Sequence, residues 1–493
     1  MRVPFRRSAV LARAPGVSRR WGSVVAAVIL AATSAAPAIA LEAPGGFLQP
    51  AVSDAVRVSA DAAPPTEAQC FAVGRRCFAP QAIYAAYNLA PLYDRGLNGR
   101  GKTIAIVDSF GSDTIAHDLH VFDQAFGVQA MCGEEGVTCT SGMPWFKVTS
   151  FQGSPGTFAP PPTSKSPGQE AHNGWSLEVS LDVEWAHSIA PEANILLVTV
   201  PTAETLGVQG FPLMMNAEQA LVDRGMANVI SQSFASAEEA FGSTQSLLNL
   251  RHAFIAAAQH GVTVLGSSGD GGTANGMKQP VGQGGSVIPY PTVEWPASDP
   301  LVTGVGGTYL CTDPTATSGR TVDSTDPPSR CRANPGVAEV GWIASGGGYS
   351  HVFAKPSYQD TLPAGSTPIG AMRGVPDVAY EASATTGVLV YDSLDGGWFV
   401  VGGTSVSCPN WAGLVAIADQ LNGGGLGLIN PALYKIGANP AMYAADFFDV
   451  TTGNNHIDPS IAGYSATTGW DPVTGLGTPN AANLIPDLVA AAH

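Results

Sequence analysis

The sequence is organised around the run Trp175-Ser-Leu-Glu-Val-Ser-Leu-Asp-Val-Glu-Trp-Ala-His-Ser-Ile189, which contains no glycine or proline and is followed by Ala190-Pro191. Because proline ends a helix, the run predicts a helix over residues 175–189. At about 100° per residue, Glu178 and Asp182 fall on one face of that helix, one turn apart. The opposite face is expected to be the wetter one, and it carries Ser176, Ser180 and His187.

The two carboxylates share their face with apolar side chains, those of Trp175, Trp185, Ala186 and Ile189. A solvated acidic pair would point away from such residues. Burial and like charge both oppose double ionisation, so we expect Glu178 and Asp182 to share a proton. Two structural interpretations stay open, a surface acidic stripe and a structural ion pair.

Apolar strands and helical segments alternate from residue 102 onward. We predict strands at residues 103–107, 194–199, 229–233 and 262–265, and helices at residues 114–126, 217–224 and 237–260. This alternation indicates an α/β domain with a mostly parallel central sheet and helices on both faces, a three-layer arrangement. Residues 273–350 show little pattern and are expected to form long surface loops. A hairpin is predicted at residues 387–401, followed by a helix at residues 406–421.

The first forty residues have the composition of a secretory signal. They contain six arginines and no acid, an apolar run at residues 24–32 and the small-residue ending Ala38-Ile-Ala40. We expect cleavage after Ala40, a leader or linker over residues 41–82 and the folded domain over residues 83–493. An uncleaved anchor is the alternative, although the apolar run is short for a membrane span.

Without those forty residues, 17 basic residues stand against 39 acidic ones, a formal charge of −22. This excess argues against nucleic acid or an anionic membrane as a partner. It also leaves the protein less charged at acidic pH.

Six of the seven cysteines form near pairs in the sequence: Cys70 with Cys77, Cys132 with Cys139, and Cys311 with Cys331. In an exported protein such pairs suggest disulfides, although six cysteines allow about fifteen connectivities. The seventh, Cys408, lies at the start of an apolar helix and is expected to be a buried, inert thiol.

Gly402-Gly-Thr-Ser405 ends a predicted strand and opens the apolar helix. Glycines let the backbone approach closely and a helix N-terminus favours developing negative charge, so a serine there suits a nucleophile. A helix-capping serine fits the pattern equally well. A nucleophilic serine needs a base, and His172 and Glu178 are the candidates. With Glu178, the pair with Asp182 would relay the proton and work in acid.

Two further motifs follow strands or lie near the C-terminus. Asp270 stands in Gly-Asp-Gly, where it is either a turn aspartate or, if protonated, a donor to an oxyanion. Asp449-Val450 and Thr467-Thr-Gly-Trp-Asp471 offer hard oxygen ligands for calcium, with an ordinary turn loop as the alternative.

Taken in this order, the motifs resemble those of the sedolisins, the serine-carboxyl peptidases with a subtilisin-like fold. The similar stretches are Ala86-Tyr-Asn-Leu-Ala-Pro-Leu92, Thr103-Ile-Ala-Ile-Val-Asp108, Glu178-Val-Ser-Leu-Asp182, Gly269-Asp-Gly271, Val375-Pro-Asp-Val378, Gly402-Gly-Thr-Ser405, and Asp449 with Gly469-Trp-Asp471. The resemblance runs from about Ile83 to Leu488. The Glu-x-x-x-Asp helix, Gly-Asp-Gly and Gly-Thr-Ser in sequence are its specific part.

The resemblance implies Ser405 as nucleophile, Glu178 as general base and acid, and Asp182 as the residue that orients Glu178. Asp270 would donate to the oxyanion, in place of the amide that subtilisin-like enzymes use. The strand carrying Ser231, Gln232 and Ser233 would pair with the substrate backbone. Calcium would be bound by the side chains of Asp449 and Asp471 and by the carbonyls of Val450, Thr467 and Gly469.

The chain departs from the family pattern at three places. Only about forty residues separate Ala40 from the predicted domain, where the family carries a large prodomain. Cys408 replaces a small residue near the nucleophile. Thr467 stands where the family often has glycine, a change that a carbonyl ligand tolerates.

These observations predict a secreted, monomeric, acid-active serine endopeptidase that hydrolyses polypeptides and binds calcium. After signal cleavage it would bind neither membrane nor nucleic acid. Two other hypotheses stay open. One is a histidine-dependent subtilisin-like protease using Asp108, His172 and Ser405 at neutral or alkaline pH. The other is a catalytically silent secreted binding protein on the same fold.

Overall fold

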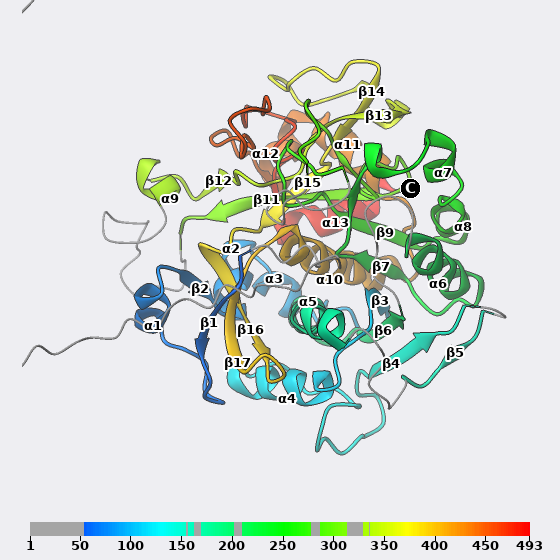
Figure 1. Ribbon diagram of the computed structural model, residues 1–493, viewed down its shortest axis with the longest axis vertical. Helices are drawn as coiled ribbons and strands as arrows, with labels where there is room; N and C mark the ends of the chain where they lie inside the picture. The colour runs from blue at the N-terminus through cyan, green and yellow to red at the C-terminus, as the bar shows by residue number, and fades with distance from the viewer. Residues whose placement is uncertain are drawn as a thin grey trace, which may run out of the picture. The chain divides into compact units, whose positions relative to one another are not determined.

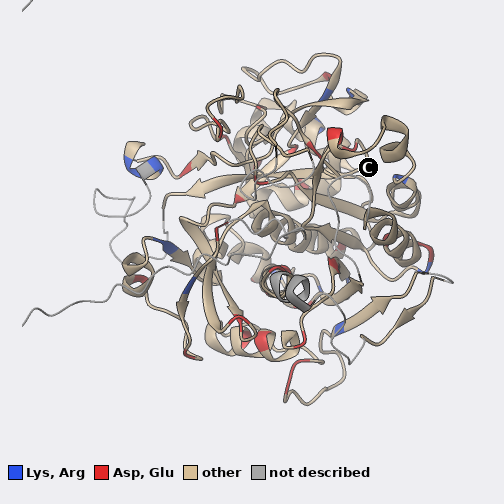
Figure 2. Cartoon of the chain, viewed as in Figure 1, with Lys and Arg blue, Asp and Glu red and all other residues tan. Residues whose placement is uncertain are grey.

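The computed structural model describes residues 54–153, 156–161, 169–201, 210–277, 286–312, 329–334 and 336–493, without the side chains of residues 169–174 and 329. The chain divides into two compact units, residues 1–41 and 42–493, and every described residue belongs to the second. The predicted signal peptide lies outside the described residues. No helix among them has the length and hydropathy of a membrane span. Acidic residues appear on many elements and basic residues on few (Figure 2).

A nine-stranded sheet runs through the domain in the order β12-β11-β9-β7-β3-β6-β4-β5, with β15 pairing to β11 (Figure 1). Its inner strands are all parallel, and β5 and β12 pair antiparallel at the ends. The parallel strands are β3 (Thr103–Ser109), β4 (Phe146–Phe151), β6 (Asn194–Val200), β7 (Val229–Gln232), β9 (Thr263–Ser267), β11 (Thr303–Leu310) and β15 (Val378–Glu381); the ends are β5 (Phe158–Ala159) and β12 (Glu339–Gly341). The predicted parallel α/β architecture is confirmed.

Alternate residues of β3 face two separate apolar layers, as period-two side chains require. Ile104 and Ile106 belong to the layer that contains α4 (Ile115–Phe126), α5 (Gln169–Ile189) and α10 (Thr404–Asn422). Ala105 and Val107 belong to the layer of α6 (Phe211–Asp223) and α8 (His252–His260). Helices therefore cover both faces of the sheet.

The shorter elements complete the domain. They are α1 (Glu67–Ala72), α2 (Pro80–Ala86), α3 (Ala90–Tyr93), η3 (Ser357–Asp360), β13 (Gly348–Ala354), β14 (Met372–Val375), α11 (Asn430–Gly437), α12 (Pro440–Asp446), β18 (Phe447–Phe448), β19 (Thr478–Pro479) and α13 (Ala481–Ala491).

Helix α5 is buried on all sides from Trp175 to Ala190, so the predicted wetter face does not exist. The reason is a second sheet of order β1-β17-β16-β2, which together with α4 covers that face (Figure 1). The predicted hairpin forms its centre as β16 (Thr386–Asp392) and β17 (Gly397–Val401). Ser176 Oγ donates to Asp392 at 2.8 Å, which shows that this face is bound to protein rather than to water.

The fold begins earlier than the predicted boundary at residue 83. Strand β1 (Val56–Ser59) pairs antiparallel with β17, and β2 (Arg76–Phe78) pairs parallel with β16. These strands are too short to carry a periodic pattern, so they could not be predicted from the sequence. The three near pairs of cysteines form the disulfides Cys70–Cys77, Cys132–Cys139 and Cys311–Cys331.

Two predictions about the middle of the chain are wrong. The helix expected over residues 237–260 is divided into β8 (Ser236–Ala237), η1 (Glu238–Ala240), α7 (Thr244–Leu248) and α8, because Ser243 caps a new helix by accepting from Ser246 N. Residues 273–350 contain β10 (Glu294–Trp295), β11, α9 (Ser329–Ala333) and β12 rather than loops alone. Glycines obscure the pattern of β11, and at Gly307 a Cβ would lie 2.4 Å from Ala382.

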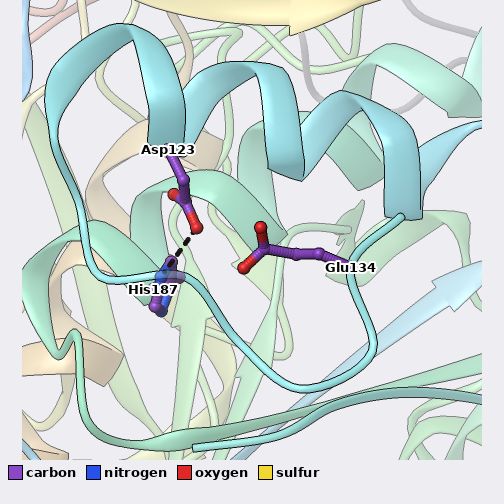
Figure 3. A group of neighbouring side chains, drawn as sticks. All are labelled: Asp123, Glu134 and His187. Atoms are coloured by element: carbon purple, nitrogen blue, oxygen red, sulfur yellow. Dashed lines mark ion pairs between the residues drawn. The ribbon is translucent and has the colours of Figure 1, made fainter. Parts of the chain in front are cut away.

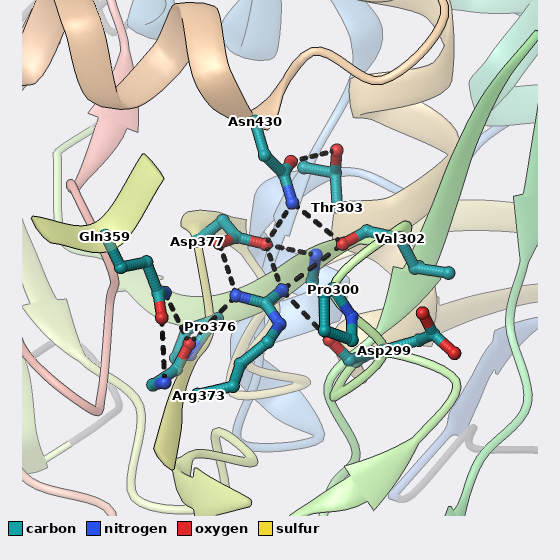
Figure 4. A network of polar contacts seen from close by, with 12 residues as sticks. Asp299, Pro300, Val302, Thr303, Gln359, Arg373, Pro376, Asp377 and Asn430 are labelled. Carbon is teal, nitrogen blue, oxygen red and sulfur yellow. Dashed lines mark hydrogen bonds and ion pairs between the residues drawn. The ribbon is translucent and has the colours of Figure 1, made fainter. Parts of the chain in front are cut away.

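A buried ion pair anchors β14, and the turn that joins it to β15, to the nine-stranded sheet (Figure 4). Arg373 Nη2 lies 2.6 Å from Asp377 Oδ2, and both side chains are fully buried. Asp377 also accepts from Gly304 N at 2.8 Å and from the Tyr434 hydroxyl at 2.9 Å. The Val-Pro-Asp-Val motif thus supplies the link between the end of β14, strand β11 and helix α11.

Candidate active site

One close contact and one electrostatic interaction indicate how α5 and α10 lie against each other. Gly413 in α10 touches Ile189 at the end of α5, where a Cβ on the glycine would lie 2.6 Å from the isoleucine side chain. Nearer the start of both helices, Cys408 is close enough to Asp182 for the carboxylate to raise the pKa of the thiol. The two helices therefore run in the same direction.

This register brings Ser405 level with Glu178. Ser405 precedes Cys408 by about one helical turn, and Glu178 precedes Asp182 by one turn. Both side chains are fully buried. The two residues are 227 positions apart in the sequence, and the packing of α10 against α5 brings together the helices that carry them.

Ser405 is the second residue of α10 and does not cap it. The capping position belongs to Gly403, which rules out the N-cap interpretation of this serine. Ser405 Oγ has no hydrogen-bond partner among the described residues. Gly402 has no room for a side chain, since a Cβ would lie 2.0 Å from Ala384 N. The helix start is thus pressed against the end of β15, with the hydroxyl at the positive end of the helix dipole.

Asp182 lies in a cluster of carboxyl groups. Burial raises the pKa of Asp182 well above its usual value, and the charges of Asp108 and Glu178 raise it further. The Ser233 hydroxyl donates to Asp182 Oδ1 at 2.8 Å and opposes this shift. Like charges in a low-dielectric interior cannot all ionise, so the cluster retains protons. The prediction that Glu178 and Asp182 share a proton agrees with this environment.

Asp108, which the sequence assigned only to the histidine-dependent alternative, acts on Asp182 in this cluster. Asp108 is the last residue but one of β3 and is fully buried, and its carboxyl oxygens have no hydrogen-bond partner among the described residues. Burial raises the pKa of Asp108 to about 7. The structure places it beside Asp182, and the side chain of His172 lies outside the described residues. Its position at the carboxyl end of a central strand was the signal that could have identified it.

Asp270 lies beside Thr404, the residue that precedes Ser405. Asp270 Oδ1 accepts from Thr404 N at 2.8 Å and from Thr404 Oγ1 at 2.9 Å. Gly269 N donates to the same threonine hydroxyl at 3.1 Å. These bonds fix the Gly-Asp-Gly loop against the first turn of α10, so Asp270 is more than an ordinary turn residue.

The side chains of the expected substrate strand point into the protein. Ser231 Oγ lies 3.4 Å from Cys408 Sγ, Gln232 Nε2 donates to Glu218 at 2.6 Å, and Ser233 holds Asp182. The main chain of Ser231 is paired with β3 on one side and β9 on the other. A substrate strand can therefore pair only beyond Gln232. Cys408 is buried, as predicted, and burial raises the pKa of its thiol to about 12.

The predicted calcium ligands lie in one loop near the C-terminus. Gly469 N donates to both carboxylate oxygens of Asp449 at 3.1 Å, and Thr467 N donates to Asp471 Oδ2 at 3.0 Å. The charges of both aspartates act on Tyr443, which donates to Asp449 at 3.1 Å. Two carboxylates gathered in one loop, with Asp471 fully buried, fit a hard divalent cation.

Comparison with known proteins identifies the family. No family model matches the chain. Kumamolisin from Bacillus sp. (strain MN-32) is 31% identical over 431 residues, which make up 86% of this chain and 66% of kumamolisin. Sedolisin from Pseudomonas sp. (strain 101) is 33% identical over 324 residues, or 65% of this chain and 49% of sedolisin. The chain belongs to the sedolisin family.

The solved structures agree with this sedolisin assignment. Pseudomonas sedolisin, a serine-carboxyl proteinase complexed with two molecules of pseudo-iodotyrostatin, matches with a TM-score of 0.63 and 26% identity. The match covers 84% of this chain and 98% of that sedolisin chain. The fold of this sedolisin-family chain is therefore subtilisin-like, as predicted. The chain spans two thirds or less of the length of the curated relatives given above.

Proposed function

We propose that the chain is a secreted serine-carboxyl endopeptidase that hydrolyses polypeptides in acid. The observation that carries this proposal is the set of buried carboxyl groups around Asp182, on a helix whose register brings Glu178 level with Ser405. A serine with a carboxylate base and no assigned histidine is suited to low pH, where buried acids keep part of their protons.

Each proposed role follows from the place of the residue. Ser405 Oγ attacks the scissile carbonyl carbon while Glu178 takes the hydroxyl proton, and Asp182 orients Glu178. Protonated Asp270 donates to the oxyanion, which forms next to the first turn of α10. Glu178 then gives its proton to the leaving amine, and water repeats the two steps on the acyl-enzyme.

The pH dependence follows from the carboxyl groups. Asp270 can donate to an oxyanion only while it holds a proton, and Glu178 can accept only while it is ionised. The raised pKa values of Asp182 and Asp108 keep a proton within the cluster into weakly acidic solution. We therefore propose an activity maximum below neutral pH that falls as the cluster ionises.

Calcium is the proposed cofactor. Asp449 and Asp471 would supply side-chain oxygens, and Val450, Thr467 and Gly469 would supply main-chain carbonyls, a set of hard ligands. The ion would neutralise two aspartates held in one loop and stabilise that loop. Removal of calcium by a chelator should lower the melting temperature of the wild type. Asp458→Asn changes an aspartate outside the proposed site and should leave this effect of the chelator unchanged.

Export and a monomeric state complete the proposal. Three disulfides and the signal-like first forty residues support secretion, and the formal charge of −22 beyond them disfavours nucleic acid and anionic membranes. A catalytically silent binding protein on this fold is the second candidate, and the histidine-dependent protease is the third.

The deciding experiment compares wild type with Ser405→Ala, Glu178→Gln and His172→Ala across the pH range, using an unfolded protein as substrate. We expect activity in acid that Ser405→Ala abolishes, Glu178→Gln nearly abolishes and His172→Ala leaves largely intact. Loss in His172→Ala with a neutral optimum would establish the histidine mechanism. An inactive but folded wild type would favour the binding protein.

A further inference from the structure

Three ionisable side chains from separate segments lie close together at the C-terminal end of α5, away from Glu178 and Asp182. Asp123 comes from the end of α4, Glu134 from the loop closed by the Cys132–Cys139 disulfide, and His187 from the last turn of α5. All three are buried, and one possible ligand atom from each lies within 4.8 Å of the others. Figure 3 shows the two carboxyl groups and the imidazole directed toward a common space.

Asp123 supplies an independent sign that this space takes a ligand. Its side chain is 2% exposed, and apart from the interactions with His187 and Glu134 themselves, neither carboxylate oxygen has a hydrogen-bond partner among the described residues. A buried carboxylate without such bonds is costly unless a positive charge lies close to it. Among the described residues, the ion partners of these carboxylates are histidines alone. His187 lies 3.1 Å from Asp123, and His120 lies 3.1 Å from Glu134.

Two distances in the cluster match the separation between neighbouring ligand atoms on one metal ion. His187 Nε2 lies 3.1 Å from Asp123 Oδ2 and 2.8 Å from the main-chain oxygen of Gln129. Ligands at right angles on an ion with bonds of roughly 2.1 Å are about 3.0 Å apart. The loop that carries Glu134 is held in place by Gly133, where a Cβ would lie 2.1 Å from Phe146 O.

We propose that Asp123, Glu134 and His187, with the carbonyl of Gln129, bind one divalent transition-metal ion of the Zn²⁺ or Mn²⁺ type. One imidazole with two carboxylates and a carbonyl is a mixed set that such ions accept, whereas calcium prefers oxygen ligands alone. The ion would join α4, the disulfide loop and the far end of α5. It would stabilise the helix that carries Glu178 and Asp182 without touching substrate.

Binding requires His187 Nε2 to give up its proton. In the structure Nε2–H donates to the Gln129 carbonyl, so the ion must displace that proton, and the one proton left on the imidazole then lies on Nδ1. Nδ1 has no hydrogen-bond partner among the described residues. The loss of a hydrogen-bond partner for the second nitrogen of a metal-bound imidazole lowers metal affinity by about 10–100-fold. We therefore expect a dissociation constant on the order of micromolar rather than nanomolar.

The test uses the purified full chain, stripped by a chelator and refilled with excess calcium, near neutral pH. Titration with ZnCl2 and separately with MnCl2 should show one bound equivalent of at least one ion and a rise of several degrees in melting temperature. Glu134→Gln should weaken binding by about 10–100-fold or more. The double variant His117→Gln/Glu135→Gln, an exposed pair on the same two segments, should bind like wild type.

Several outcomes would overturn the proposal. They are the absence of stoichiometric binding by either ion, unchanged binding in Glu134→Gln, and loss of binding in the exposed control pair. Because Glu134→Gln could fail to fold, X-ray absorption of the metal-loaded wild type gives a second measurement. A shell with one imidazole among oxygen ligands supports the site, and a shell with none or with two excludes it.

Discussion

Asp270 accepts a 2.8 Å hydrogen bond from the main-chain nitrogen of Thr404, the residue that precedes Ser405. A second bond from the Thr404 hydroxyl, at 2.9 Å, reaches the same oxygen. Both bonds fix the carboxyl group of Asp270 relative to the first turn of α10. In the proposed mechanism this placement decides where an oxyanion could be stabilised.

Replacing Asp270 therefore tests the oxyanion role. Asp270→Ala removes the donor and should lower kcat by about 10²–10³-fold with a smaller change in KM. Asp270→Asn retains an acceptor for Thr404 and a donor that does not titrate, so its activity should extend to higher pH than that of wild type. Steady-state kinetics across pH check both. Equal activity of folded Asp270→Ala and wild type would contradict the assignment.

Ser233 tests the carboxyl cluster without removing any carboxyl group. Its hydroxyl stabilises ionised Asp182, so Ser233→Ala should raise the pKa of Asp182 further. We expect the pH–rate profile of this variant to move upward along the pH axis. Ser231→Ala, which removes only a contact with Cys408, is the matched control and should leave the profile in place. A profile unchanged in Ser233→Ala would argue against a catalytic role for Asp182.

Glu218 predicts how stability depends on pH. It is fully buried on α6, and burial raises its pKa to about 8, above the roughly 4.3 of an unfolded chain. Between these values the unfolded chain loses a proton that the folded chain keeps, so the free energy of unfolding falls as pH rises from about 4 to about 8. The melting temperature of wild type should fall across this range. Glu218→Gln should reduce that fall while keeping a partner for Gln232, and an unchanged slope would refute the prediction.

The buried ion pair of Arg373 with Asp377 predicts a large loss of stability on breaking it. Arg373→Met leaves a charged aspartate without its cation in the core, at a cost of about 3–5 kcal/mol. Lys355→Met removes the cation of a pair whose aspartate, Asp360, is exposed, and should cost less than about 1 kcal/mol. Urea unfolding of both variants makes the comparison. Similar losses in the two would contradict this account.

The sequence predicted the parallel sheet and the carboxylate helix because long periodic segments such as α5 and β3 carry their own signal. It did not predict which residues cover α5. Ser176 and His187 are polar, and only the tertiary packing of β16 and α4 buries them. Strand β11 escaped prediction because its glycines serve close backbone contacts rather than side-chain alternation.

The candidate site likewise divides into residues that stand in local sequence motifs and residues whose position depends on tertiary packing. Ser405, Glu178, Asp182 and Asp270 stand in motifs that are each ambiguous alone and become specific only when taken together in their order along the chain. Asp108 was visible only as a polar strand end, since its closeness to Asp182 depends on how the sheet packs against α5. The inward turn of Ser231 and Gln232 likewise depends on neighbours that no local pattern specifies.

The sheet of β1, β17, β16 and β2 has a practical consequence for shortened forms of the protein. Its outer strands come from residues 56–59 and 76–78, and its inner hairpin covers the helix that carries Glu178 and Asp182. A chain trimmed to residue 83 would leave both edges of that hairpin open. The unpaired backbone groups of exposed edge strands can form hydrogen bonds with strands of other molecules, and a two-stranded hairpin alone is only marginally stable in water. Self-association, rather than a change at Glu178 and Asp182, would then limit a truncated form, so a soluble fragment should begin before Val56.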